Sequence, residues 1–314
     1  MQDAEFTDAW RSGEWDGRHR LFRESNEGSR YFPVGCLQRV RSILNAFGVD
    51  YEVEGVVNPG QGDLDVSWDT EMTPREYQQD AVEDGLRHGS GIVAMPTGSG
   101  KTLIGLRLLS RLKRPAMVLC HRQEIADQWI EKMRDILGVD VAQCYGGTRE
   151  NGDFMVGLYQ SIYDDDNSEV RDSVRTDHDV LIADECHRVG AKTFSQVALN
   201  INATYRYGLS ATPEREDNAT LRVIGGTGEM IADIRPEGLI EDGYLAQPRW
   251  EILDAPRAGG SYRQWQAEYK SEIVENDARN QLIADKVEDL PKPCYVHVER
   301  INHGERLEGL IEDA

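Results

Sequence analysis

The 314-residue sequence lacks any long hydrophobic run, and its uninterrupted apolar stretches cover only a few residues. A helix that spans a membrane needs about 20 consecutive apolar residues, so we expect no membrane span. The N-terminal stretch MQDAEFTDAW is too acidic for a secretory signal peptide. The five cysteines are scattered and include no C-x-x-C pair, which favours reduced, buried thiols. These absences predict a cytoplasmic globular protein.

Lysine is scarce, because only 7 of the 35 basic residues are lysine and none precedes Lys101. Acidic residues number 56, and the net charge is −21. Proteins that bind nucleic acid are usually basic, so the charge by itself argues against such a partner. The same composition is typical of halophiles that accumulate salt, in which surplus carboxylates keep proteins soluble. We therefore interpret the acidity as the mark of a halophilic source, which leaves the ligand open.

One stretch, from Gly91 to Thr102, joins an apolar run to a glycine-rich loop and reads GIVAMPTGSGKT. Residues 92–95 are expected to form a buried strand, and Lys101 opens a helical pattern. In such a strand, loop and helix, backbone N–H groups and the helix N-terminus face an anion. Loop glycines let the backbone approach phosphate, Lys101 can reach the terminal phosphates, and the Thr102 hydroxyl can hold Mg²⁺. The strict G-x-x-x-x-G-K-[ST] pattern fails only at its first position, where Met95 stands.

Two further predicted strands end in polar residues. Residues 179–183 (DVLIA) precede the tetrapeptide D-E-C-H, which begins at Asp184. Asp184 can hold a Mg²⁺ ion that bridges nucleotide phosphates, and Glu185 can orient and deprotonate an attacking water. Residues 205–209 precede the tripeptide S-A-T, which begins at Ser210. The separation between the phosphate loop and the acidic pair predicts that these two segments serve one nucleotide site.

The motifs P-T-G-S-G-K-T, D-E-C-H and Y-G-L-S-A-T-P-E-R-E-D resemble those of superfamily 2 helicases, in the XPB and UvsW branch rather than among DEAD-box RNA helicases. The resemblance implies a RecA-like fold with ATP and Mg²⁺ as ligands. It implies the nucleotide contacts Gln78, Pro96, Thr97, Gly98, Ser99, Gly100, Lys101 and Thr102. It gives Gln78 the role of reading adenine and His187 a relay role beside the catalytic residues Lys101, Asp184 and Glu185. It makes Ser210 and Thr212 the residues that couple hydrolysis to DNA.

The same resemblance implies DNA contacts at other predicted strand ends, where ligands of parallel sheets bind. The predicted strands 116–120, 139–145 and 154–158 place these residues there: His121, Arg122, Gly146, Gly147, Gln160 and Ser161. Helix capping is the competing explanation for the polar group at 121–124. Gly146 and Gly147 have no side chain, so their backbone can approach a phosphate closely.

We predict an α/β protein in three parts. Residues 1–69 form a small α+β accessory domain, with a helix at 36–47 and a strand at 51–57. Its short motifs resemble the DNA-engaging N-terminal domain of UvsW-type helicases, although its arginines, such as Arg18 and Arg20, also fit a solvated surface. Residues 70–235 form a P-loop NTPase domain, a RecA-like parallel sheet flanked by helices. Residues 236–314 form a connection and a partial second RecA-like domain, with strands at 248–253 and 294–298 and mostly helix at 261–290.

The leading hypothesis is an ATP-dependent DNA helicase or translocase that acts in repair, recombination or fork remodelling. The arginine motif Q-x-x-G-R-x-x-R of the family has no counterpart in the sequence. We therefore expect a C-terminally truncated chain, or a separate chain that supplies the second RecA-like domain, with weak Mg·ATP binding and slow hydrolysis by this chain alone. Two alternatives are an ATP-binding DNA-recognition module without motor activity and a subunit of a restriction-type translocase.

Overall fold

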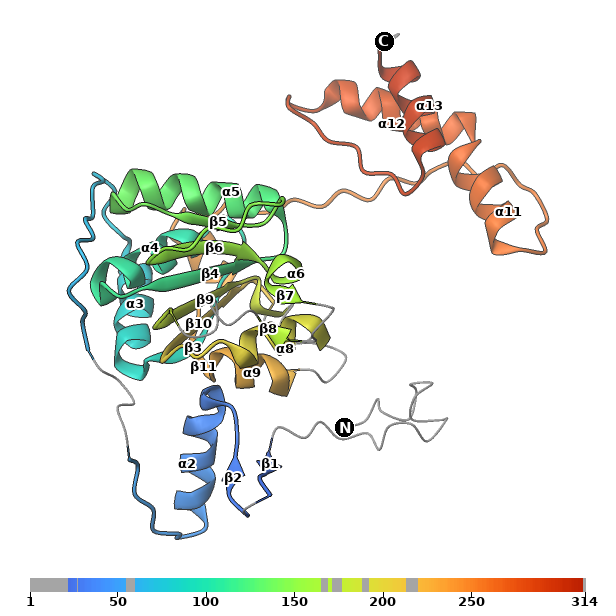
Figure 1. Cartoon of the computed structure of the whole chain (residues 1–314). Coiled ribbons are helices and arrows are strands. Elements are labelled where there is room, and N and C mark those ends of the chain that lie inside the picture. Colours follow the sequence, from blue (N-terminus) through green and yellow to red (C-terminus); the bar gives the residue numbers. More distant parts are fainter. Residues whose placement is uncertain are drawn as a thin grey trace. The chain divides into compact units, whose positions relative to one another are not determined.

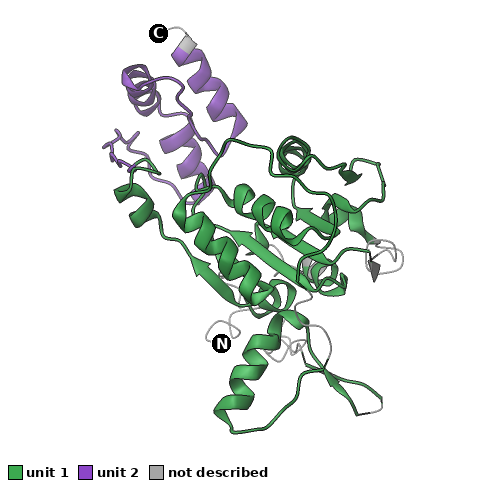
Figure 2. Cartoon of the chain, turned by 90° about the vertical axis from the view of Figure 1, so that its left-hand side faces the viewer, with its two compact units in different colours: residues 1–246 green, residues 247–314 purple. Residues whose placement is uncertain are grey.

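The computed structural model describes residues 22–26, 28–54, 60–164, 169–170, 177–187, 192–212 and 220–312. The chain divides into two compact units, residues 1–246 and 247–314, which Figure 2 shows in different colours. The predicted DNA-facing arginines Arg18 and Arg20 lie outside the described residues, as does the P-E-R-E-D end of the helicase phrase.

Seven parallel strands form the central sheet of the first unit (Figure 1). They are β3 (Ser90–Ala94), β4 (Ala116–Cys120), β5 (Ala142–Cys144), β6 (Phe154–Leu158), β9 (Val180–Asp184), β10 (Tyr205–Ser210) and β11 (Met230–Asp233). Their order across the sheet is β11-β3-β10-β9-β4-β6-β5, and every neighbouring pair is parallel. The predicted parallel sheet is therefore confirmed. A separate antiparallel pair joins β7 (Tyr163–Asp164) to β8 (Glu169–Val170).

Helices lie on both faces of the sheet (Figure 1). They are α3 (Glu76–His88), α4 (Lys101–Leu112), α5 (Gln123–Lys132), α6 (Tyr159–Ile162), α8 (Lys192–Asn200) and α9 (Thr220–Thr227). A further short helix, α10 (Pro236–Glu241), follows β11 in the chain. α5 continues as a π-helical turn, η3 (Met133–Leu137), which Gly138 ends in the left-handed region. Within the described residues, no helix is long and apolar enough to cross a membrane.

Strand side chains alternate between two hydrophobic cores, because successive residues of a strand point to opposite faces. In β4, Val118 belongs to the core that also holds Leu108 of α4. Its neighbour Met117 belongs to the other core, together with Val197 of α8. All four side chains are fully buried. Burial on both faces explains why these strands are continuous apolar runs in the sequence.

The N-terminal part contains a short antiparallel pair, β1 (Arg23–Glu24) and β2 (Arg30–Tyr31), the 3-10 turn η2 (Val34–Cys36) and α2 (Leu37–Ala46). The helix predicted at 36–47 is thus confirmed. Gly35 lies so close to α9 that a Cβ there would collide with the carbonyl oxygen of Ile224. The strand predicted at 51–57 is wrong for residues 51–54, which are exposed and pair with no described strand, and residues 55–57 lie outside the description.

The second unit contains α11 (Trp265–Tyr269), the π-helical turn η5 (Lys270–Val274), α12 (Asp277–Asp289) and α13 (Ile301–Glu312). Helix was predicted for most of 261–290, and α11, η5 and α12 confirm it. The preceding loop folds onto η5, where the Glu272 carboxylate accepts the N–H groups of Ala258 at 2.7 Å and Gly259 at 3.1 Å.

The strands predicted at 248–253 and 294–298 are wrong, because no strand forms in the described residues of the second unit. Trp250, Ile252 and Tyr295 are 89%, 93% and 91% exposed. No apolar layer covers these side chains in the described residues, so strand pairing would bury little apolar surface there. In the first unit, the strand predicted at 139–145 is shorter, at 142–144, and the edge strand β11 was missed.

Candidate nucleotide site

Three neighbouring strands bring the predicted nucleotide residues together at their carboxyl ends. β3 leads into the phosphate loop, residues 96–100, and β9 ends at Asp184. β10 lies between these strands and ends at Ser210. Strands of one sheet are about 4.8 Å apart, so the loop and the acids begin roughly 10 Å from each other. Side chains of ordinary length can bridge that distance.

The phosphate loop is shaped by glycines in the left-handed region. Gly98 has a φ of +83° and Gly100 a φ of +95°. Glycine adopts these angles without the steric cost that a Cβ would add. The loop ends where α4 begins at Lys101, so the N-terminal N–H groups of α4 face the space beside the loop. Pro96 and Thr97 start the loop, and Thr102 lies in the first turn of α4, partly buried.

Gln78 of α3 ties this loop to the rest of the domain. Its side-chain Nε2 donates to the Ser99 carbonyl oxygen at 2.9 Å, and the Tyr77 hydroxyl donates to the same oxygen at 2.8 Å. The Gln78 Oε1 accepts the backbone N–H of Arg75 at 2.9 Å. The predicted contact of Gln78 with adenine stays a prediction, because here both ends of the amide hold backbone groups.

Lys101 and Glu185 meet across the site. The Lys101 Nζ lies 3.0 Å from the Glu185 Oε1, and the two side chains are only 13% and 23% exposed. Glu185 follows β9 directly and has a φ of +50°, the left-handed region, which is uncommon for a residue with a side chain. This turn of the backbone accompanies the placement of the Glu185 carboxylate beside the phosphate loop.

Asp184 is 7% exposed, and both of its carboxylate oxygens accept hydrogen bonds. The Trp129 indole Nε1 donates to Oδ2 at 2.8 Å, and the Glu185 backbone N–H donates to Oδ1 at 2.9 Å. Burial raises the pKa of Asp184 above its usual value, whereas the hydrogen bond from Trp129 lowers it. A carboxylate with fixed orientation therefore lies at the end of β9.

His187 and Ser210 connect the acids to β10. The His187 Nδ1 lies 3.0 Å from the Ser210 hydroxyl and 3.4 Å from the Glu185 Oε2. The Ser210 hydroxyl in turn lies 3.4 Å from the same Oε2 and accepts the Thr212 backbone N–H at 3.1 Å. The structure thus joins all four residues in one hydrogen-bonded group that starts at Glu185.

Known proteins share this chain's sequence motifs and fold. The family described as "Type III restriction enzyme, res subunit" matches residues 71–215. The DNA 3'-5' translocase XPB2 of Sulfurisphaera tokodaii is 32% identical over 143 residues, which cover 46% of this chain and 31% of the relative. The ATP-dependent DNA helicase uvsW of Enterobacteria phage T4 is 22% identical and aligns with 98% of this chain and 66% of its own length.

Over these regions the chain is similar to superfamily 2 helicases of the XPB and UvsW branch. The crystal structure of the UvsW helicase from bacteriophage T4 has the same fold, with a TM-score of 0.57 and 20% identity over 74% of this chain and 88% of that one. The chain spans about a third to two thirds of the length of the curated relatives that it matches.

The residues around the phosphate loop fit a magnesium-bound triphosphate. The phosphate loop offers bare backbone and a helix N-terminus to an anion, and Lys101 adds a positive charge beside it. The Asp184 carboxylate and the Thr102 hydroxyl are oxygen ligands of the kind that Mg²⁺ prefers, and Mg²⁺ usually takes its other ligands from phosphates and water. These groups therefore suit ATP and Mg²⁺ as ligands.

The predicted DNA contacts divide into two groups. Arg122 and Gln160 line one hollow of about 570 Å³ at the carboxyl ends of β4 and β6. His121 and Ser161 are their partly buried neighbours in sequence. Gly146 and Gly147 lie in an exposed turn after β5, with φ of +62° and +85°. Contact of either group with DNA remains a prediction.

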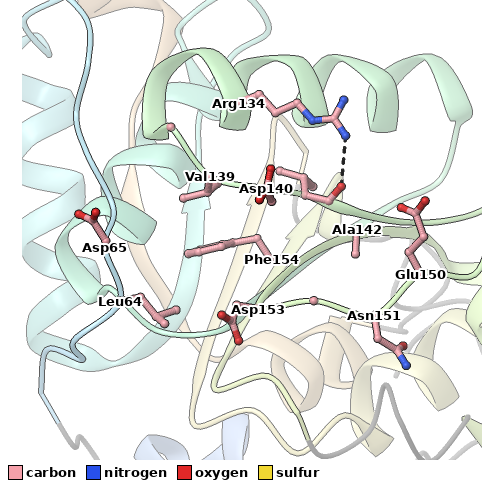
Figure 3. Close-up of a pocket in the computed structure, with 13 residues that line it drawn as sticks. Leu64, Asp65, Arg134, Val139, Asp140, Ala142, Glu150, Asn151, Asp153 and Phe154 are labelled. Carbon is pink, nitrogen blue, oxygen red and sulfur yellow. Dashed lines mark hydrogen bonds between the residues drawn. The ribbon is translucent and has the colours of Figure 1, made fainter.

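A larger hollow of about 690 Å³ lies elsewhere, at the amino ends of β5 and β6 (Figure 3). Its lining includes four acidic side chains, Asp65, Asp140, Glu150 and Asp153. The Arg134 guanidinium in this hollow donates to the carbonyl oxygen of Val141 at 3.3 Å. An acidic lining would repel a triphosphate, so this hollow does not suit a nucleotide, whereas the phosphate loop with Lys101 beside it does.

Sequence analysis missed three residues that shape the site. Trp129 was part of a helix with no assigned role, since a pattern of residues gives no hint that an indole N–H will meet Asp184. Tyr244 and Leu245 fell in a supposed connection. The Arg75 guanidinium lies 4.1 Å from the centre of the Tyr244 ring, and a Cβ on Gly98 would lie 3.6 Å from Leu245. Their only sequence signal was an apolar pair after α10.

Proposed function

We propose that this chain supplies the first motor domain of an ATP-dependent DNA helicase or translocase that acts in repair, recombination or fork remodelling. The observation that carries the proposal is the convergence of Lys101 and Glu185, at 3.0 Å, beside a buried Asp184. These are the groups that phosphoryl transfer to water requires: a cation for the phosphates, a carboxylate for the metal and a base for the water. The names of the XPB2 and uvsW relatives support DNA as the partner.

Each side chain of the site has its own role in this proposal. Lys101 exchanges its partner Glu185 for the terminal phosphates, which leaves the Glu185 carboxylate free to accept a proton from the attacking water. Asp184 and Thr102 would hold the Mg²⁺, which supplies charge neutralisation for the phosphates. Gln78 keeps the phosphate loop in place through Ser99.

Ser210 and His187 report the state of Glu185 to the rest of the domain. Both lie within 3.4 Å of the Glu185 Oε2, so a shift of that oxygen changes their hydrogen bonds. Thr212 follows through its bond to Ser210. We propose that this group couples hydrolysis to DNA held near Arg122 and Gln160. Most contacts of proteins with DNA go to the backbone, which lets an acidic chain bind DNA through few basic residues.

We infer that the second unit corresponds to the start of a second RecA-like domain. Residues 248–253 and 294–298 have strand-like sequences, and their side chains Trp250, Ile252 and Tyr295 are almost fully exposed. We propose that these side chains pack against other parts of such a domain when it is complete. We also propose that the whole protein works in the cytoplasm.

ATP hydrolysis by the full 314-residue chain tests the proposal, measured as phosphate release in molar KCl with and without duplex DNA. We expect slow hydrolysis that Glu185→Gln lowers by a factor of ~10² or more, because general bases contribute about that much. Glu237→Gln, on the exposed face of α10, is the matched control and should leave the rate unchanged. Hydrolysis that survives Glu185→Gln would remove the proposed base, and fast DNA-stimulated turnover would contradict the assignment of the second unit as an incomplete second motor domain.

A further inference from the structure

Trp129 has a large side chain with a single polar atom, the indole Nε1, whose N–H donates a hydrogen bond to Asp184. The ring is 1% exposed, and its Nε1 donates to the Asp184 Oδ2 at 2.8 Å. The other oxygen, Oδ1, accepts the backbone N–H of Glu185 at 2.9 Å. Two donors on the two oxygens of one carboxylate fix its rotation about the Cβ–Cγ bond. The remaining lone pairs of both oxygens then point in set directions.

The indole ring itself is held against the phosphate-loop helix. A Cβ built on Gly105 of α4 would lie 2.6 Å from the Trp129 Cη2 atom, which is closer than real Cβ atoms approach. Glycine at this position therefore lets the ring fit between α4 and the sheet. Trp129 contacts α4 and bonds to the end of β9, and it belongs to α5.

α5 also carries a predicted DNA contact at its start. Arg122 is the N-cap of α5, and Trp129 lies seven residues further along, about 10 Å at 1.5 Å per residue. A helix of this length moves as one body. A displacement of Arg122 would thus reach the Trp129 N–H and, through it, the Asp184 carboxylate.

We propose that Trp129 is a positioning residue that orients Asp184 for the metal and links that orientation to α5. The proposal rests on the proposed function, since Asp184 must hold Mg²⁺ for its orientation to matter. Simple core packing by the ring would also explain its burial, but packing requires no N–H. Trp129→Phe separates the two roles, because it keeps an aromatic ring and removes the donor.

The experiment measures binding of a fluorescent ADP to the full chain while Mg²⁺ is titrated, and compares four proteins: wild type, Trp129→Phe, Trp68→Phe and Asp184→Asn. Trp68 is the matched control, because it packs against the same core beneath the Arg107 guanidinium, at 4.8 Å, and makes no hydrogen bond to the described residues of the site. We expect Trp129→Phe to raise the Mg²⁺ concentration at half-saturation about tenfold, as for loss of one hydrogen bond to a charged group. Metal-free nucleotide binding should stay within twofold of wild type, and Trp68→Phe should match wild type throughout.

A second readout needs no variant at position 129. The indole N–H signal of Trp129 in the ¹⁵N-labelled protein, identified by elimination with Phe substitutions of the other five tryptophans, should shift when Mg·ADP is added and should not shift with ADP alone. An unchanged Mg²⁺ dependence in Trp129→Phe, an equal loss of metal-free and Mg²⁺-dependent binding, or a signal that ignores Mg²⁺ overturns the positioning role. If Asp184→Asn also leaves the Mg²⁺ dependence unchanged, the proposed function fails instead.

Discussion

Arg206 of β10 offers the sharpest test of what holds the motor domain together. Its side chain is 2% exposed, and among the described residues no carboxylate pairs with it. The guanidinium instead donates to backbone carbonyls near the ends of α8 and α9. These acceptors are the carbonyl oxygens of Gly226 at 2.7 Å, Ile201 at 2.9 Å, Ala203 at 3.3 Å, and Ala198. A cation thus satisfies carbonyls that helix ends leave unpaired.

The change to test is Arg206→Met, which keeps much of the side-chain volume and removes the donors. Four buried carbonyls that lose their donor cost roughly 1 to 3 kcal/mol each. Part of this loss is offset, because burial lowers the pKa of Arg206 to about 10, which corresponds to roughly 3 kcal/mol of desolvation cost at about 1.36 kcal/mol per pKa unit. We expect a net destabilisation of about 4 kcal/mol, and a melting temperature lower by roughly 8 to 16 °C for a unit of this size.

Thermal unfolding in molar KCl, followed by far-ultraviolet circular dichroism, measures the effect. Arg111→Met is the matched control, because Arg111 pairs with Glu83 at an exposed position and surface ion pairs contribute about 1 kcal/mol or less. Arg206→Lys should fall between Arg206→Met and wild type, since one ammonium cannot reach all four carbonyls. If Arg206→Met melts with the wild type, or no lower than Arg111→Met, the carbonyl-capping explanation is refuted.

Four further outcomes follow from the site and the second unit. Gly100→Ala should weaken nucleotide binding at least tenfold in a fluorescent-ADP titration, since a Cβ at a φ of +95° would collide with the Gln78 amide. The control Gly309→Ala, where a Cβ meets nothing within 4 Å, should leave nucleotide binding unchanged. Lys101→Ala should abolish ATP binding, because it removes the cation beside the phosphate loop; binding that persists would contradict the role of Lys101. Arg122→Ala should weaken DNA binding and reduce its salt dependence without changing ADP affinity, and an unaltered salt slope would remove Arg122 from the DNA surface. The hydrogen bond from the Ala258 N–H is the main cause that lowers the pKa of Glu272, so the contact between Glu272 and its loop is present above the ordinary Glu pKa and is lost as pH falls through the lowered pKa. The amide NMR signals of Ala258 and Gly259 should follow this loss, and in Glu272→Gln they should be insensitive to pH.

The fold of the motor domain was predictable because its strands are buried on both faces. β4 and β6 match the predicted ranges 116–120 and 154–158 to the residue. Apolar runs bounded by polar turns leave little ambiguity when a strand has covered faces. β11 was missed for the opposite reason. It is an edge strand whose side chains are partly or fully exposed, so its four residues carry no strong pattern.

The parts of the candidate site that need a particular backbone conformation were predictable, because that conformation requires residues that form a motif in the sequence. Glycines mark the left-handed turns of the phosphate loop, and the D-E pair follows a buried strand. Contacts that depend on tertiary packing left no such mark, such as the bond from Trp129 to Asp184 and the approach of Leu245 to Gly98. The strands predicted at 248–253 and 294–298 show the converse, since a strand-like sequence stays extended and unpaired without neighbours to pair with.

The left-handed backbone of Glu185 has one more consequence. A residue with a side chain pays about 1 kcal/mol or more for this conformation, and glycine would adopt it freely. A screen that rewards only folded protein would therefore drift toward glycine at position 185, whereas a screen for turnover would keep the acid. The residue found at position 185 would therefore distinguish variants selected for stability from variants selected for ATP hydrolysis.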